Sequence, residues 1–136
     1  METRDRSINA NMNKEIINSI IRNRKSIYPK DYSKEDIPDK TIKEILLNAN
    51  HAPTHRMTQP WFFKVYKNKS KQKLIDVVSK IDESKLSKIK LNKFIEKVND
   101  SNAIISIFLN RDLKERLPEW EEIAAVSMSV QNMWLT

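Results

Sequence analysis

The sequence predicts one α+β domain, and three observations support this fold class. Most of the 136 residues fall into segments in which apolar side chains recur every three to four positions, the period of an amphipathic helix. Two shorter segments, 61–66 and 103–109, are rich in aromatic and β-branched residues and are typical of strands. The length is that of one domain with one core, and no internal repeat or low-complexity linker divides it.

The N-terminal part predicts a flexible arm followed by a helix. Residues 1–12 are polar and are expected to form the arm, so the domain itself is expected to span 13–136. Asn13 is a plausible N-cap for the first helix. Its apolar face is formed by Ile16, Ile17, Ile20 and Ile21.

A second helix is expected to begin at Asp39, as its cap, and to end near Asn50. Pro53 disfavours helical geometry at the residue before it, so His51 should lie at the exit of this helix. The predicted strand 61–66 begins at Trp61, which is expected to belong to the core.

The second half of the chain predicts three more helices and one more strand. Amphipathic helices are expected over 68–81 and 84–98. The run 103–109 is continuously apolar, which is typical of a central strand covered on both faces. A last helix begins at Pro118 and still shows no cap or breaker near Thr136.

Two residue types are missing from the chain, and each absence excludes a class of chemistry. Without cysteine there are no disulfides, thiolate nucleophiles or cysteine-ligated metals. Without glycine there is no glycine-rich phosphate loop and no nucleophile elbow.

The net charge of +7 could indicate a nucleic acid, a membrane surface or an anionic ligand. Lysines between Lys67 and Lys97 alternate with apolar residues at helical spacing, which favours solvated helix faces. The tryptophans lie in apolar segments rather than among basic residues, so no nucleic-acid partner is expected. No apolar run approaches about 20 residues, and the N-terminus lacks a signal-peptide pattern. We therefore expect no membrane association and a cytoplasmic location.

The loop 51–61 contains both histidines of the chain. His51 and His55 are four residues apart, as in zinc-binding helices, but Pro53 between them breaks the helix that would place both on one face. No carboxylate is near them in the sequence, so a metal site is not expected. A catalytic role beside a nucleophilic serine is not expected either, because the chain has no nucleophile elbow. The alternative to a binding role is that both are simply exposed histidines of a loop.

Three residues at the end of the first helix could bind an anion. Arg24 supplies a bidentate fork, Lys25 a point charge and Ser26 a hydroxyl. The alternative is a basic C-terminus that complements the helix dipole. From these residues alone, the two interpretations are equally supported.

Together, the basic triplet and the loop resemble the flavin-dependent nitroreductase family, in its small single-domain branch with a histidine in this loop. The shared pattern is Arg24-Lys25-Ser26 after one helix and Ala52-Pro53, five further residues and Gln59-Pro60-Trp61 after the next. The segment 118–133 is similar to the helix that crosses the dimer core in that family. The resemblance extends over about residues 13–136 and implies helices around a small mixed sheet.

The resemblance also implies a cofactor and a partner. In this family FMN lies at the interface of an intertwined homodimer and passes hydride from NAD(P)H to a nitro, quinone or similar small-molecule acceptor. By position, the implied cofactor-binding residues are Arg24, Lys25 and Ser26 of one subunit and His51 and His55 of the other. Lys25 replaces a second arginine, which keeps the charge but loses the fork. No catalytic side chain is implied, because the cofactor supplies the chemistry.

The chain also departs from the family pattern. The family's last helix continues into a glycine-rich turn, a tryptophan-containing strand and a C-terminal arm, and the sequence given stops before these. We therefore expect a fold lacking that C-terminal part. The alternative function is a catalytically inactive remnant that serves at most for dimerisation or binding.

Overall fold

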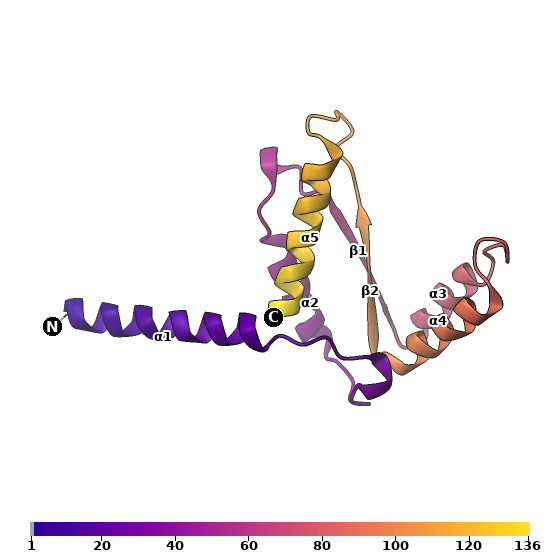
Figure 1. Cartoon of the computed structure of the whole chain (residues 1–136), viewed down its shortest axis with the longest axis horizontal. Helices are drawn as coiled ribbons and strands as arrows, with labels where there is room; N and C mark the ends of the chain where they lie inside the picture. Colours follow the sequence, from indigo (N-terminus) through magenta and orange to yellow (C-terminus); the bar gives the residue numbers. More distant parts are fainter. Residues whose placement is uncertain (1) are drawn as a thin grey trace.

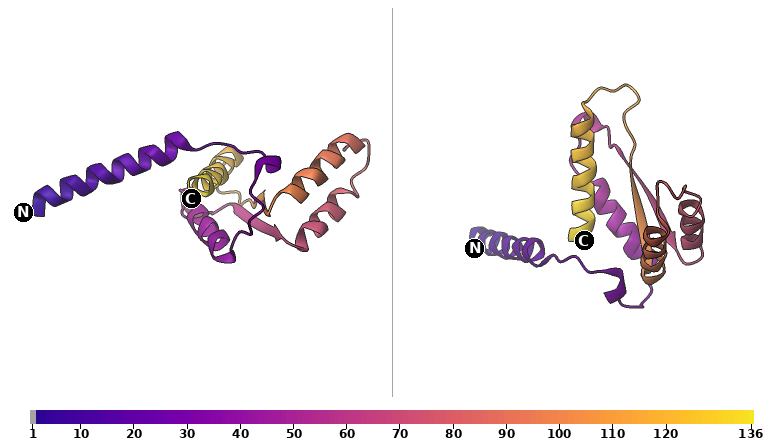
Figure 2. Two further views of the ribbon diagram at one scale, coloured as in Figure 1. Left: turned by 90° about the horizontal axis from the view of Figure 1, so that it is seen from below. Right: turned by 45° about the vertical axis from the view of Figure 1, so that its right-hand side comes forward.

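The computed structural model describes residues 2–136, and their side chains from Met12 onward. Its helices and strands, in chain order, are α1 (Glu2–Asn23), α2 (Asp39–Asn50), β1 (Trp61–Lys67), α3 (Ser70–Val78), α4 (Lys88–Asp100), β2 (Ala103–Leu109) and α5 (Glu119–Leu135). Short 3-10 turns lie at Pro29–Asp31 (η1) and His55–Met57 (η2). The predicted α+β class is confirmed. Helices α2 and α5 lie beside the sheet, while α1 and the α3–α4 hairpin project on opposite sides (Figure 1, Figure 2).

Helix α1 begins earlier than expected. The sequence predicted its start at Asn13, but the helix starts at Glu2. Residues 2–13 contain no proline or glycine, so nothing in their backbone chemistry interrupts a helix. A boundary between an arm, 1–12, and a domain, 13–136, stays a prediction. The isoleucine face of α1 is exposed, because α1 extends away from the rest of the chain (Figure 1).

The two strands pair antiparallel in the described chain, with Trp61 opposite Leu109 and Lys67 opposite Ala103. The expectation that 103–109 is covered on both faces is wrong here. Strand β2 has β1 as its one partner in the described chain, and its residues Ile107 to Leu109 are exposed. The rings of Phe62 and Phe108 lie 5.8 Å apart on the uncovered face.

The core forms where α5 packs against α2 and the start of β1. Ala52, Trp61 and Ala125 are its buried centre, with Phe63 and Val126 packed around them. The expected core position of Trp61 is confirmed, and its indole Nε1 donates a hydrogen bond of 2.9 Å to Asn50 Oδ1. This bond ties the end of α2 to the start of β1.

Lys67, at the end of β1, holds the segment that leads into α2. Its Nζ donates to the carboxylates of Asp36 at 3.0 Å and Asp39 at 3.1 Å, and to the Ile37 carbonyl. Hydrogen bonds to Asp36 and Asp39 raise the pKa of Lys67 above its usual 10.5. Asp39 was expected to cap α2, but Pro38 occupies the N-cap position and the Asp39 carboxylate turns to Lys67.

The helices of the α3–α4 hairpin are shorter, and the turn between them is longer, than the sequence predicted, since α3 ends at Val78 and α4 begins at Lys88. The Lys71 ammonium donates to the carbonyls of Val98, Asn99 and Ser101, the last at 2.7 Å. A cation at this position satisfies carbonyls that a helix end leaves unpaired. None of the described helices combines the length and apolarity required to cross a bilayer.

The connector between α2 and β1 has an unusual backbone. Arg56, Met57 and Gln59 have φ of 51°, 55° and 42°, in the left-handed region. Residues with a Cβ pay roughly 1–2 kcal/mol there, and such strain clusters at functional sites. A chain without glycine must place side-chain-bearing residues at these positions.

A buried carboxylate fixes the start of α5. Glu122 is 1% exposed and accepts bonds from the Asp112 backbone N–H at 3.0 Å and from Arg111 Nε at 2.9 Å. The Asp112 N–H, followed by the Arg111 guanidinium, lowers the pKa of Glu122 below its usual 4.5. The pair therefore anchors the loop 110–118 to the helix.

This arrangement predicts how stability depends on pH. A carboxyl whose pKa is lower in the folded state stabilises the fold fully above its unfolded pKa, and this contribution is lost as the pH falls through the folded pKa. We expect Glu122→Gln to lower the free energy of unfolding at neutral pH. The gap to the wild type should narrow as the pH falls below 4.5. Urea denaturation of both proteins across this range measures the gap. Glu119→Gln, at the exposed carboxylate near the same arginine, should show a far smaller gap, and a gap that widens in acid contradicts the prediction.

The connector backbone generates a second prediction. Met57 is 76% exposed, so truncating it removes little packing. Met57→Gly should raise the free energy of unfolding by about 0.5–1 kcal/mol relative to Met57→Ala, because alanine keeps the Cβ that makes a positive φ costly. Urea midpoints of the two variants test this. A glycine variant less stable than the alanine variant would show that Met57 carries no backbone strain.

Candidate functional site

Three of the predicted site residues lie close to helix α5, one at its start and two near its end. His55 contacts its first turn through Glu121, and His51 lines a hollow with residues of its last turn. Arg24 lies against Trp134 near its end. One helix therefore positions residues from two distant parts of the sequence.

The basic triplet begins directly after α1, where the backbone leaves the helix. The Arg24 guanidinium lies 4.8 Å from the centroid of the Trp134 ring, within the range of a cation–π interaction. Its Nη1 also donates a bond of 3.4 Å to Ser26 Oγ. Arg24 is half-buried, while Lys25 and Ser26 are exposed. Two cationic side chains and a hydroxyl are thus available at one place.

No carboxylate forms an ion pair with Arg24 among the side chains described from Met12 onward. Two described arginines do form ion pairs: Arg111 with Glu122 and Arg116 with Asp112. None of the described carboxylates therefore occupies the N–H groups of Arg24, whose one described hydrogen bond is the one from Nη1 to Ser26.

His55 lies at the edge of a hollow between the loop and α5. Its Nδ1 is 2.7 Å from Glu121 Oε2, which orients the ring. The hollow has a volume of about 460 Å³, a size typical of small-molecule sites. Its walls are mostly apolar and include Pro53, Trp120 and Met128. Such a hollow suits a flat apolar ring with one polar edge.

His51 lies at the exit of α2, as predicted, where its backbone N–H bonds to the Asn48 carbonyl. It lines a second hollow of about 320 Å³ together with Asn48 and residues of the last turn of α5. Two hydrogen bonds join the end of α2 to the end of α5. Asn132 Nδ2 donates to the Asn48 carbonyl at 3.0 Å, and Asn48 Nδ2 donates to Thr136 Oγ1 at 3.1 Å. The hollow beside His51 is therefore lined mostly by polar side chains.

The structure does not bring the two histidines together. His55 bonds to Glu121, whereas His51 shares a hollow with Leu135, and these two residues of α5 are fourteen residues apart, which is about 21 Å along a helix. Arg24 and His51, by contrast, both lie near the last turns of the same helix. Residues 24–26 and His55 of one chain therefore cannot contact the same small group.

Sequence reasoning missed two residues that position the predicted ones. Glu121 is 66 residues from His55, and Trp134 is 110 residues from Arg24. Glu121 belongs to an acidic helix start, and Trp134 to an apolar helix. No local pattern marks either residue as a partner, because both contacts depend on how α5 packs.

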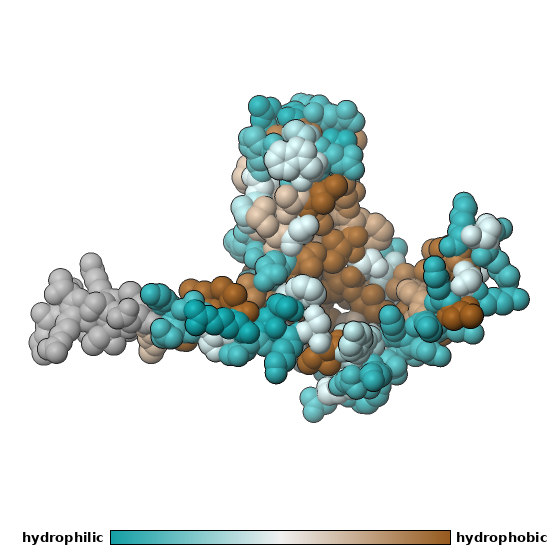
Figure 3. Space-filling model, viewed as in Figure 1, coloured by the Kyte–Doolittle hydropathy of each residue, from teal (hydrophilic) through white to brown (hydrophobic). Residues whose placement is uncertain are grey.

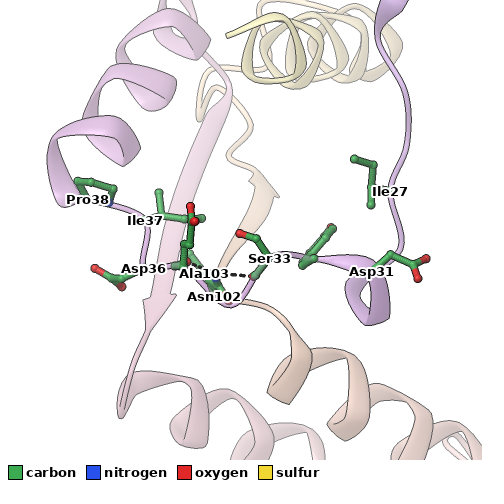
Figure 4. Close-up of a pocket in the computed structure, with 10 residues that line it drawn as sticks. Ile27, Asp31, Ser33, Asp36, Ile37, Pro38, Asn102 and Ala103 are labelled. Carbon is green, nitrogen blue, oxygen red and sulfur yellow. Dashed lines mark hydrogen bonds between the residues drawn. The ribbon is translucent and has the colours of Figure 1, made fainter.

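Another hollow lies away from the predicted site residues. Its volume is about 490 Å³, and it is formed by the segment between α1 and α2 and by Asn102 and Ala103 at the start of β2 (Figure 4). Asn102 donates to the Ser33 carbonyl at 3.1 Å and also to the Glu35 carbonyl. None of the five predicted site residues lines this hollow. No cluster of three metal-ligating side chains occurs in the described part of the chain.

Known proteins are similar to this chain in sequence and in structure. The chain is 30% identical over 124 residues to YfhC of Bacillus subtilis (strain 168), whose name assigns it to the NAD(P)H nitroreductases. This alignment covers 88% of the chain and 62% of YfhC. The chain thus spans about three fifths of the length of this relative.

Solved structures share the fold. A nitroreductase-like family protein from Bacillus cereus has a TM-score of 0.73 at 25% identity, over 88% of this chain and 62% of that one. The FMN-dependent nitroreductase NfnB from Mycobacterium smegmatis, solved with NADPH, has a TM-score of 0.65 at 13% identity, over 90% of this chain and 69% of that one. The second likeness concerns the fold alone.

The family assignment rests on most of the chain. Residues 21–136 match the nitroreductase family, and they include α2, the loop with both histidines, the sheet and α5. The match begins within α1 and contains the basic triplet. The chain belongs to the nitroreductase family.

Proposed function

We propose that this protein is an FMN-dependent oxidoreductase of the nitroreductase type. The observation that carries the proposal is the state of Arg24, which is held against Trp134, bonded to Ser26 and free of any carboxylate partner in the described chain. When bound, FMN would supply the redox chemistry, taking hydride from NAD(P)H and delivering it to a nitro, quinone or similar acceptor. The protein's part is to bind and orient.

The residues present fit the cofactor phosphate. A phosphate carries about two negative charges and accepts several hydrogen bonds. Arg24 and Lys25 offer two positive charges, and Ser26 offers a hydroxyl, all on an accessible segment that follows a helix. A helix dipole alone would need only the charges, so the Arg24–Ser26 bond favours the anion-site interpretation over dipole compensation.

The flavin ring requires a different environment, and the hollow beside His55 supplies one. Its apolar walls suit an aromatic ring system, and the His55–Glu121 pair offers polar atoms at its edge. The hollow beside His51 offers amide and hydroxyl groups instead. In this proposal the triplet of one subunit and the histidine loop of the other bind one cofactor, since a single chain keeps Arg24 and His55 apart.

A homodimer is therefore part of the proposal. Helix α5 exposes Trp120, Ile123 and Met128, and α1 exposes its isoleucine face. Figure 3 shows apolar side chains at the surface of both helices. Exposed apolar area of this extent is typical of an interaction surface, and a second copy of the chain would cover it.

The alternative is a chain that keeps the fold but not the activity. The exposure of Phe62, Ile107 and Phe108 on the two-stranded sheet favours it, because a sheet with so much uncovered apolar surface is a marginal scaffold. In that case the chain would serve only for dimerisation or for binding a partner.

A binding experiment separates the two functions. Titrating the purified chain with FMN, followed by quenching of flavin fluorescence, should show saturable binding. Arg24→Ala should weaken it about 10- to 100-fold, because a charge-assisted hydrogen bond is lost. His55→Ala should weaken it about two- to tenfold, the loss expected for one neutral hydrogen bond. Oxidation of NAD(P)H with a nitro or quinone acceptor then tests turnover.

Arg22→Ala is the matched control for the phosphate contact. Arg22 lies in the last turn of α1 and is exposed, two residues before Arg24. Its removal should change FMN binding much less than Arg24→Ala does. A chain that binds FMN without turnover supports the inactive alternative, and wild-type affinity in both Arg24→Ala and His55→Ala would show that the assigned site is wrong.

A further inference from the structure

The Arg24–Trp134 contact joins residues that are far apart in sequence and outside the core. Trp134 is 58% exposed, and its ring lies 4.8 Å from the Arg24 guanidinium carbon. Arg24 is the first residue after α1, so its side chain begins where the helix no longer constrains the backbone. An arginine at such a place has many conformations, and a bound anion must select one of them.

Apart from the bond of Nη1 to Ser26, none of the described acceptors takes up the N–H donors of Arg24. A cation–π contact is an attraction between the charge and the face of the ring, so it requires none of the N–H hydrogen bonds that the guanidinium can donate. A carboxylate partner would occupy these donors, as Asp112 does in its bidentate contact with Arg116 at 2.7 and 3.0 Å. Trp134 thus restricts Arg24 without using the donors that a phosphate needs.

We propose that Trp134 is a positioning residue for phosphate recognition, in that its ring holds the Arg24 guanidinium with its donor edge presented to the phosphate of a flavin mononucleotide. This inference rests on the proposed function and extends the site to the end of α5. The ring acts through Arg24 and does not itself bind the phosphate. Its contribution should therefore appear for FMN and be absent for riboflavin, which has the same ring system and lacks the phosphate.

The test compares the affinities of these two ligands. The FMN-to-riboflavin affinity ratio is measured by fluorescence titration at fixed salt for the wild type, Trp134→Leu and Trp134→Phe. An exposed cation–π contact predicts that Trp134→Leu lowers the ratio about two- to fivefold, while Trp134→Phe, which keeps an aromatic face, lowers it less. Leucine and phenylalanine are both apolar but smaller than tryptophan, so a loss of packing alone should affect FMN and riboflavin alike. Tyr28→Leu, at an exposed aromatic residue near the triplet, should leave the ratio unchanged.

A double-mutant cycle checks the route of the effect. In an Arg24→Ala background, Trp134→Leu should not change the ratio further, because the residue through which it acts is gone. A Trp134→Leu variant that loses affinity for both flavins equally, or for neither, overturns the inference. So does an undiminished effect in the Arg24→Ala background.

The proposed function and this inference fail in different ways. A wild-type chain that binds FMN and riboflavin equally keeps the flavin site but overturns phosphate recognition by Arg24 and Trp134. A wild-type chain that binds neither flavin overturns the proposed function and this inference together.

Discussion

The close packing of α5 against α2 determines where the candidate site residues of this chain can lie. Three small residues make the approach possible, because Ala49, Ala125 and Ser129 are almost fully buried where the helices meet. Helix axes approach according to the size of the side chains between them, so a larger residue at any of these positions would separate the helices. The buried Ser129 hydroxyl donates to the Val126 carbonyl at 2.6 Å and leaves no unpaired polar atom in the contact. The position of α5 then sets the places of Glu121 and Trp134.

Much of the fold could be predicted from local patterns. Helix α2, β1 and α5 were found within one or two residues because their apolar periods are clear and their ends carry proline or polar residues. The errors have physical causes as well. Asp39 turned to Lys67 instead of capping α2, since an ammonium from β1 is a stronger partner than a backbone N–H. The prediction that β2 is covered on both faces was wrong because an apolar run indicates that a strand tends to be buried. It does not show which elements lie beside the strand.

The candidate site was predictable only in part. The triplet 24–26 and the histidine loop are local patterns, and a family resemblance could give them a role. The contacts that orient them, Arg24 with Trp134 and His55 with Glu121, join distant segments and follow from tertiary packing. The distance between His51 and His55 could not be predicted from the sequence either. Pro53 interrupts the helix between them, and the conformation of the residues after it depends on tertiary packing. The sequence thus predicted candidate binding groups, and the structure shows the contacts that orient Arg24 and His55.

Because the chain has no glycine, the histidine loop has residues with side chains at positive φ, and this bears on its proposed role in binding. Five described residues have positive φ, and three of them, Arg56, Met57 and Gln59, lie within this one loop. Glycine would adopt these angles at little cost in the folded state, but it would also leave the loop more conformations before ligand binding. Residues with side chains restrict the loop once the fold has forced them into place, and the His55–Glu121 bond and Pro60 restrict it further. A loop held in this way would lose little conformational entropy on binding a ligand, which is the advantage of a preorganised site. The fold thus holds this loop in one conformation, and both its strained backbone and the orientation of His55 follow from that.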